Sequence, residues 1–359
     1  MFVYLFLLLL TVIATFIGGK NRKNVGWGVF IILNFIFLVG LRGHNVGTDT
    51  DNYWYAYLYQ MGNRMEPLFH LVRDCCRYIN LSVNAYFTVL STLTFLPLWW
   101  FIKRESSNFG FSLLIYYTFS TLFFFQTFNV VRACLAISYL LVCCFYIRNN
   151  KYKRAIFFAL IAVMFHYSAL MIIFIIIITS CIKRLNFFIV LASISITFII
   201  GLSFGTFVQD LAVGLSAADA FTSADSEALD NYQNYLDKFE DSTWNLVGAL
   251  ATMLPFSVIT ILTFNKEHAQ NIYYRLLFIG VIINNAFVAA MFTYRITMYL
   301  LIFSIIVLPN AYSKACSIKK LMIIGFTTLM VLWFIYSLIT ANDSSFNEAY
   351  PYEMCFNDV

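Results

Sequence analysis

The chain has 359 residues, of which 61% are hydrophobic and only 11% are charged. A soluble domain is about 25% charged and about 45–50% apolar, so this composition excludes an ordinary soluble protein and indicates a membrane protein. The net charge of +5 is small for the length and identifies no partner, and no nucleic-acid ligand is expected.

The N-terminal run MFVYLFLLLL lacks the basic start and small-residue cleavage site of a signal peptide, so we expect it to form a first membrane span. Later apolar runs are also long enough to cross a bilayer core, which takes roughly 17–20 residues. The runs are continuous rather than alternating, which predicts helices, because backbone in lipid must bond within its own segment. We therefore predict an all-α, polytopic bundle of about 12 transmembrane helices. The predicted spans are 2–18, 25–41, 84–102, 109–128, 130–147, 155–166, 168–182, 186–205, 244–264, 276–293, 296–312 and 321–340.

The short turns that carry most of the Lys and Arg then fall on one side of the membrane. By the positive-inside rule that side is cytoplasmic, which places both termini outside. Three outer segments remain, at 42–83, 206–243 and 341–359, and the whole of 1–359 is expected to be a single transmembrane domain. A stretch within the first of them, 67–80, has apolar residues at helical spacing and is predicted to lie along the membrane interface.

One part of this topology has two readings. Residues 155–182 are short for two full spans, and a single span there would reverse the sidedness of everything that follows. We prefer two short or tilted helices that place His166 at an outer turn.

The first outer segment opens with RGHNVGTDTDNYWYAY, which brings Arg42, His44, Asp49, Asp51 and Tyr53 together at a membrane face. Such a mixture is typical of a site for a polar ligand that carries phosphate or sugar. The two carboxylates share a face on an extended segment but point roughly 200° apart on a helix. Each is a candidate general base towards a sugar hydroxyl or a partner for an outer Arg. A third reading is a capped turn, since this stretch also has the pattern of a helix start.

Three arginines lie at the predicted outer ends of apolar runs, namely Arg42, Arg132 and Arg295. A charge at membrane depth is costly, so it tends to be functional or paired. The planar guanidinium fork matches phosphate oxygens, and several forks at one surface are suited to a lipid pyrophosphate. The alternative is that these side chains only extend to lipid headgroups.

Two further polar breaks carry candidate residues. His166 lies between AIFFALIAVM and ALMIIFIIII, where it is a candidate general base, a hydrogen-bond donor to phosphate or a helix cap. Tyr294 precedes Arg295 in another break and is a candidate ligand contact or an interfacial anchor. The eight cysteines show no metal-ligand spacing, so neither a metal nor a cofactor is predicted.

Several stretches together resemble the EpsG-like, Wzy-type polymerases of O-antigen and exopolysaccharide synthesis. They occur in the family's order over most of the chain: Arg42 with GTDTDNYWYAY, EPLFHLV, NVVRACLAISYLL, KYKRAIFFALIAVMFHYSAL and YRITMYL. The similarity is weaker after residue 300 and in 206–243. Where the family often has Arg-Gln, this chain has Arg132-Ala133.

The resemblance implies a multi-pass protein of the bacterial inner membrane with its active face in the periplasm. Its partners would be undecaprenyl-pyrophosphate-linked repeat units, membrane lipid and a chain-length regulator protein. A growing glycan would be transferred onto a lipid-linked repeat unit, with lipid pyrophosphate as the leaving group. Arg42, Arg132 and Arg295 would bind that group, and His166, Asp49 or Asp51 would act as base. By analogy alone, the fold would resemble a GT-C bundle.

Two other classes remain open. A flippase for the same lipid-linked unit would place charge at mid-membrane and show repeat symmetry, neither of which is evident here. A membrane acyltransferase that modifies the glycan would use His166 but would leave the ordered Arg and Asp residues without a role.

Overall fold

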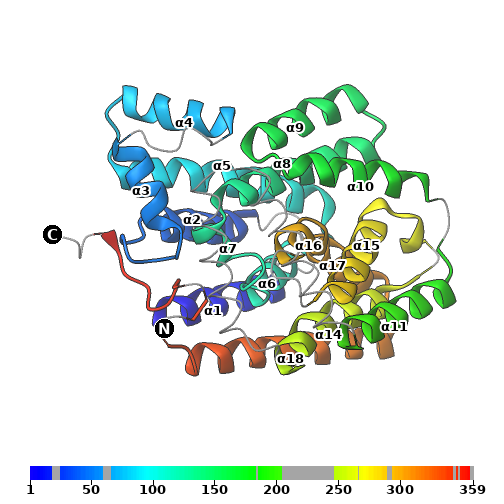
Figure 1. Cartoon of the computed structure of the whole chain (residues 1–359). Coiled ribbons are helices and arrows are strands. Elements are labelled where there is room, and N and C mark those ends of the chain that lie inside the picture. The colour runs from blue at the N-terminus through cyan, green and yellow to red at the C-terminus, as the bar shows by residue number, and fades with distance from the viewer. Residues whose placement is uncertain are drawn as a thin grey trace. The chain divides into compact units, whose positions relative to one another are not determined.

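The computed structural model describes residues 1–17, 25–59, 66–182, 185–203, 246–265, 267–288, 293–342, 345–346 and 348–355. Their regular elements are helices, as predicted, and no strand is assigned within these ranges (Figure 1). The chain divides into two compact units, the first formed by 1–182 with 302–359 and the second by 183–301. The predicted outer segment 206–243 lies outside the described residues.

The first unit holds most of the polar sequence motifs. Its helices are α1 (Phe2–Ile17), α2 (Val25–Gly40), α3 (Thr50–Tyr59), α4 (Pro67–Tyr78), α5 (Val83–Glu105), α6 (Phe109–Thr118), α7 (Gln126–Asn129), α8 (Val131–Arg148), α9 (Tyr152–Phe165), α10 (Ala169–Cys181), α17 (Ser304–Lys314) and α18 (Ser317–Ile339). Helix α1 packs on α6, α2 on α5, α5 on α8, and α8 on α9, while α4 also contacts α9 (Figure 1).

The second unit is formed by α11 (Phe187–Ser203), α14 (Leu246–Thr263), a short 3₁₀ helix (His268–Gln270), α15 (Ile272–Ala286) and α16 (Thr293–Leu301). Helix α15 packs against each of the other three α-helices. Gly280 of α15 permits a close approach to α16, because a Cβ there would lie 2.7 Å from the Cβ of Leu300.

Within the part of the chain that the structure describes, five helical segments are long and apolar enough to cross a membrane: Val83–Glu105, Val131–Arg148, Leu246–Thr263, Tyr294–Lys314 and Ser317–Ile339. Shorter apolar helices accompany them, including Phe2–Ile17 and Phe187–Ser203. Helix α18 exposes large apolar side chains such as Leu321 (70%) and Leu329 (61%), as expected of a surface in contact with lipid. The chain is thus an all-helical membrane protein, and the count of about 12 spans stays a prediction.

The structure differs from the sequence prediction at 109–128, where no single helix spans the range. Helix α6 ends at Thr118, and a series of turns leads to the four-residue α7. The Ser120 hydroxyl donates to the Tyr117 carbonyl, and the Gln126 amide donates to the Thr121 carbonyl at 2.7 Å. Internal bonds of this kind permit irregular backbone at membrane depth, provided that it is buried in protein.

The predicted break at His166 is confirmed, since α9 ends at Phe165 and α10 begins at Ala169. Both helices expose apolar side chains, among them Leu160 (59%) and Ile178 (64%). The predicted amphipathic helix at 67–80 is also present as α4, which buries Phe69 on one face.

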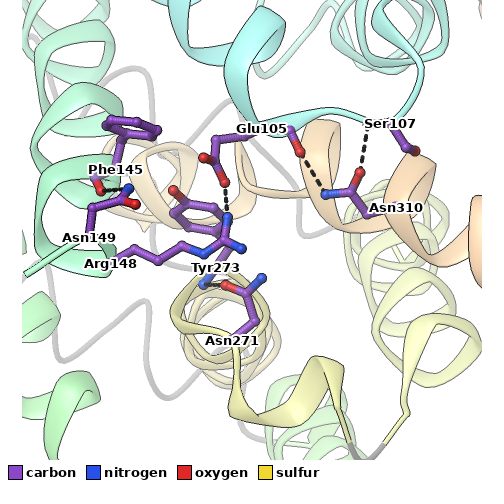
Figure 2. Close-up of polar contacts among 8 residues, drawn as sticks. All are labelled: Glu105, Ser107, Phe145, Arg148, Asn149, Asn271, Tyr273 and Asn310. Atoms are coloured by element: carbon purple, nitrogen blue, oxygen red, sulfur yellow. Dashed lines mark hydrogen bonds and ion pairs between the residues drawn. The ribbon is translucent and has the colours of Figure 1, made fainter.

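The polar turns of the first unit gather at two ends. At one end, Arg148 of α8 pairs with Glu105 of α5, and Asn310 of α17 bridges this region to the α5–α6 turn (Figure 2). The Asn310 amide donates to the Glu105 carbonyl at 2.8 Å and accepts from the Ser107 amide at 2.7 Å. These turns are among the basic ones that the sequence assigns to the cytoplasmic side.

Gly110 of α6 permits a close approach between α6 and α1. A Cβ at this position would overlap the backbone of Ala14 in α1, whereas one at Gly325 of α18 would meet nothing within 4 Å. We therefore expect Gly110→Ala to lower the melting temperature of the detergent-solubilised protein by several degrees, because overpacking costs about 1–3 kcal/mol. Gly325→Ala is the matched control. Equal melting temperatures for the two variants would contradict the α1–α6 packing.

Candidate functional site

The other end of the first unit carries the sequence-predicted polar residues. The N-terminus of α1 lies there, since the Tyr4 hydroxyl donates to the Ala349 carbonyl of the C-terminal segment. Residues 348–355, here called the C-terminal strap, also run beside residues 41–47. The Gly43 amide donates to the Glu353 carbonyl at 2.8 Å, and the Cys355 amide donates to the Leu41 carbonyl at 3.0 Å. Two of the predicted outer segments therefore lie together.

A buried carboxylate joins three elements at this end. Glu66 immediately precedes α4, Arg132 is in the first turn of α8, and His166 ends α9. Glu66 Oε2 accepts from Arg132 Nη1 at 2.7 Å, and Glu66 Oε1 lies 2.6 Å from His166 Nδ1. The Tyr167 amide also donates to Oε1 at 3.4 Å. The side chain of Glu66 is only 4% exposed, whereas those of Arg132 and His166 are 29% and 28% exposed.

The neighbours of Glu66 determine its charge. Burial by itself would raise the pKa of this carboxyl, but the hydrogen bond with His166 and the nearby Arg132 outweigh it and lower the pKa to about 2. Glu66 is therefore ionised at neutral pH and acts only as a hydrogen-bond acceptor.

This depressed pKa predicts how stability depends on pH. Because the pKa of Glu66 is about 2 in the folded protein against 4.5 ordinarily, its ionised form stabilises the fold above pH 4.5. That contribution is lost as the pH falls from 4.5 towards 2. We expect the difference in melting temperature between the wild type and Glu66→Gln to shrink over this window. A difference that stays constant from pH 4.5 to 2.5 would contradict the assignment.

Tyr53 extends the cluster on the side of α3. Its hydroxyl forms a hydrogen bond with the Arg132 side chain, and its ring packs on Phe69 at 5.6 Å between centroids. Burial raises the pKa of Tyr53 above its ordinary value, with Arg132 opposing the rise, so the phenol stays protonated. Asp49 interacts electrostatically with both Tyr53 and Arg42.

The two predicted carboxylates have different surroundings. The Asp49 carbonyl accepts from the Tyr53 amide at 3.2 Å, which confirms the predicted helix start at this point. Asp51, two residues further along the chain, pairs with His44 Nδ1 at 3.0 Å, and the side chain of Asp51 is 56% exposed. The ring of His44 packs edge-on against Trp54 at 5.0 Å. Asp49 therefore faces the buried cluster and Asp51 faces outward.

Arg42 is fully buried, which the sequence did not indicate. Its guanidinium lies over the ring of Phe87 at 4.3 Å, and Nη1 donates to the Thr127 carbonyl at 3.4 Å. Nε and Nη2 have no hydrogen-bond partner among the described residues. Burial lowers the pKa of Arg42 to about 10, with Tyr53, Tyr352 and Asp49 opposing, so the charge persists at neutral pH.

A small cavity of about 10 Å³ adjoins Arg42 and is also lined by Ser91, Thr94 and Thr127. These three hydroxyls donate to the backbone carbonyls of Phe87, Leu90 and Phe124, and each hydroxyl oxygen can still accept a hydrogen bond.

The remaining predicted residues belong to the second unit. In α16, Arg295 Nε donates to the Tyr294 hydroxyl at 3.1 Å, and the guanidinium lies over the same ring at 5.8 Å. The predicted contribution of this pair to the site stays a prediction.

Glu66 is the residue that the sequence analysis missed. It lies in EPLFHLV, one of the stretches that carry the family resemblance, but a Glu before a Pro by itself has only the pattern of a helix start. Its partners are 66 and 100 residues away along the chain, so no local spacing links them.

The fold and the polar cluster together define a class, that of all-helical membrane proteins with an Arg-, His- and carboxylate-containing site at one end. The family model of the EpsG family matches residues 25–354, which include all the residues of this cluster. The chain belongs to the EpsG family, the family of exopolysaccharide and O-antigen polymerase-like proteins. No curated protein and no solved structure gives a significant match.

Proposed function

We propose that this protein is a polysaccharide polymerase that joins undecaprenyl-pyrophosphate-linked repeat units at the periplasmic face of the bacterial inner membrane. Membership of the EpsG family supports the reaction class. The observation that carries the site is the meeting of His166 and Arg132, from two different helices, around one buried carboxylate. A base and a cation are the two groups that a glycosyl transfer with an anionic leaving group uses.

In this reaction the bond between the anomeric carbon of the donor glycan and its pyrophosphate oxygen breaks. The electron pair leaves with the lipid pyrophosphate, and a hydroxyl oxygen of the acceptor sugar bonds to that carbon. His166 takes the hydroxyl proton, with Asp49 and Asp51 as the alternative bases. Metals and covalent intermediates have no part in the proposal.

The leaving group carries charge that cations must stabilise. Arg132 is assigned to bind it directly, because its side chain is part-exposed whereas that of Arg42 is fully buried. Arg42 adds positive charge from beneath the surface, and Tyr53 and His44 contact the substrate in this scheme. Arg295 and Tyr294 of the second unit keep their predicted roles as ligand contacts.

The surface glycan of the source strain, with the gene deleted and then restored, tests the proposal. We expect the deletion to leave a single repeat unit where the wild type shows a ladder, because units are made and exported but not joined. Loss of even the single unit would favour a lipid-linked oligosaccharide flippase. An intact ladder that lacks only an acyl group would favour a membrane acyltransferase. Either result would overturn the assignment of this protein as a polymerase.

A further inference from the structure

Glu66 is placed as a helix cap but does not act as one. It occupies the position before α4, with Pro67 as the first helical residue, and its side chain makes no capping hydrogen bond. Instead, its two oxygens reach two other helices, Oε1 towards the end of α9 and Oε2 towards the start of α8. A side chain that was needed only to begin α4 would bond to the amides of α4.

The contact with His166 determines which imidazole nitrogen is available. An ionised carboxylate can only accept, so His166 Nδ1 must carry the proton that it donates to Glu66. In the neutral ring, Nε2 then has a free lone pair. Glu66 thereby holds the tautomer that a base needs, and the 3.4 Å contact with the Tyr167 amide fixes the carboxylate next to the helix end.

The contact with Arg132 determines which donors are free for a ligand. Nη1 is held by Glu66, and the Tyr53 hydroxyl bonds to the same side chain. Arg132 Nε is buried, and the described residues offer it no acceptor. The side chain of Arg132 is nevertheless 29% exposed, and the oxygens of a pyrophosphate fit a guanidinium fork that is already oriented.

We propose that Glu66 is the positioning residue of the transfer reaction, holding His166 in the tautomer that accepts a proton and Arg132 in the orientation that receives pyrophosphate. This role rests on the proposed function. The same carboxylate bonds to both the base and the cation, so it sets the distance between them. His166 can then act on the acceptor hydroxyl while Arg132 binds the leaving group. Glu66 itself touches neither the substrate nor the reacting atoms.

A double-mutant cycle in a purified system tests this role. The substrate is the lipid-linked repeat unit extracted from the source strain that lacks this gene, and the measurement is the initial rate of polymer formation. We expect Glu66→Gln to lower this rate by on the order of 100-fold, with a smaller change in the apparent KM for the repeat unit. Asp74→Asn is the matched control, because it removes a carboxylate of the same helix that pairs with Arg73 at 2.9 Å.

The decisive comparison is Glu66→Gln in a His166→Gln background. If Glu66 acts through His166, the loss caused by Glu66→Gln is clearly smaller in the His166→Gln background than in the wild type, and the remaining loss reflects the contact with Arg132. Losses that multiply would overturn the role, and so would a wild-type rate in Glu66→Gln. Should Glu66→Gln fail to accumulate in the membrane, Glu66→Asp serves the same cycle, since it keeps the charge and shortens the reach. Absence of polymer from the wild-type protein would instead overturn the proposed function.

Discussion

His166→Gln is expected to reach the membrane in normal amounts and to form polymer about 10²–10⁴ times more slowly than the wild type, the usual contribution of a general base. Glutamine fills a similar volume and can still donate to Glu66, but it cannot take a proton from a sugar hydroxyl. The measurement is the initial rate with extracted lipid-linked units. His70→Gln, in α4 of the predicted outer segment 42–83, is the matched control.

Asp49 and Asp51 are the alternative bases, and each predicts a different result that would contradict the role of His166. A wild-type rate in His166→Gln, together with loss of activity in Asp49→Asn, would transfer the role to the carboxylate that faces Tyr53 and Arg42. Loss of activity in Asp51→Asn alone would assign the role of base to Asp51, which is exposed and pairs with His44.

Arg132→Lys is expected to shorten the polymer and to lower its rate of formation by about 10- to 100-fold, although the charge is retained. Lysine has no planar fork, so it cannot bond to Glu66 and Tyr53 and also meet pyrophosphate oxygens in a fixed geometry. The loss should be larger in Arg132→Met, because Glu66 then keeps a buried charge without its cation. Arg104→Lys, an exposed arginine of α5 that lies over Trp100, is the control.

The three arginines have different expected responses. Arg42→Lys should lower stability as well as activity, because it removes the contact with Phe87 and leaves a smaller, more strongly hydrated cation in a buried position. Arg295→Lys should act on polymer formation alone. Normal polymer from all three Lys variants would refute the assignment of these arginines to the leaving group.

The sequence predicts the helices and the positions of the polar breaks well, because both follow from the cost of polar groups in lipid. The break at His166 and the helix start after Asp49 are local in origin, and both are confirmed. The order of the predicted spans places the Arg42 segment and the C-terminal strap on the same side of the membrane. The structure places both at one end of the first unit, which agrees with that order.

The tertiary contacts could not be predicted in this way. Glu66 meets His166 and Arg132 only because α4, α8 and α9 pack together, and one sequence contains no signal for that packing. Arg42 was expected at the surface, yet the rings of Phe87 and Phe128 enclose it. The predicted span 109–128 is interrupted after Thr118, where turns replace the helix up to α7. The contacts of Glu66 and Arg42 show tertiary packing that the local pattern does not contain.

The most direct test is a reconstitution of the purified protein in liposomes with extracted lipid-linked repeat units. Our account predicts that this chain by itself forms polymer and releases one lipid pyrophosphate for each bond made, and that His166→Gln stops both together. Repeat units that cross the bilayer without being joined, or that stay unjoined at a protein concentration comparable to theirs, would contradict it.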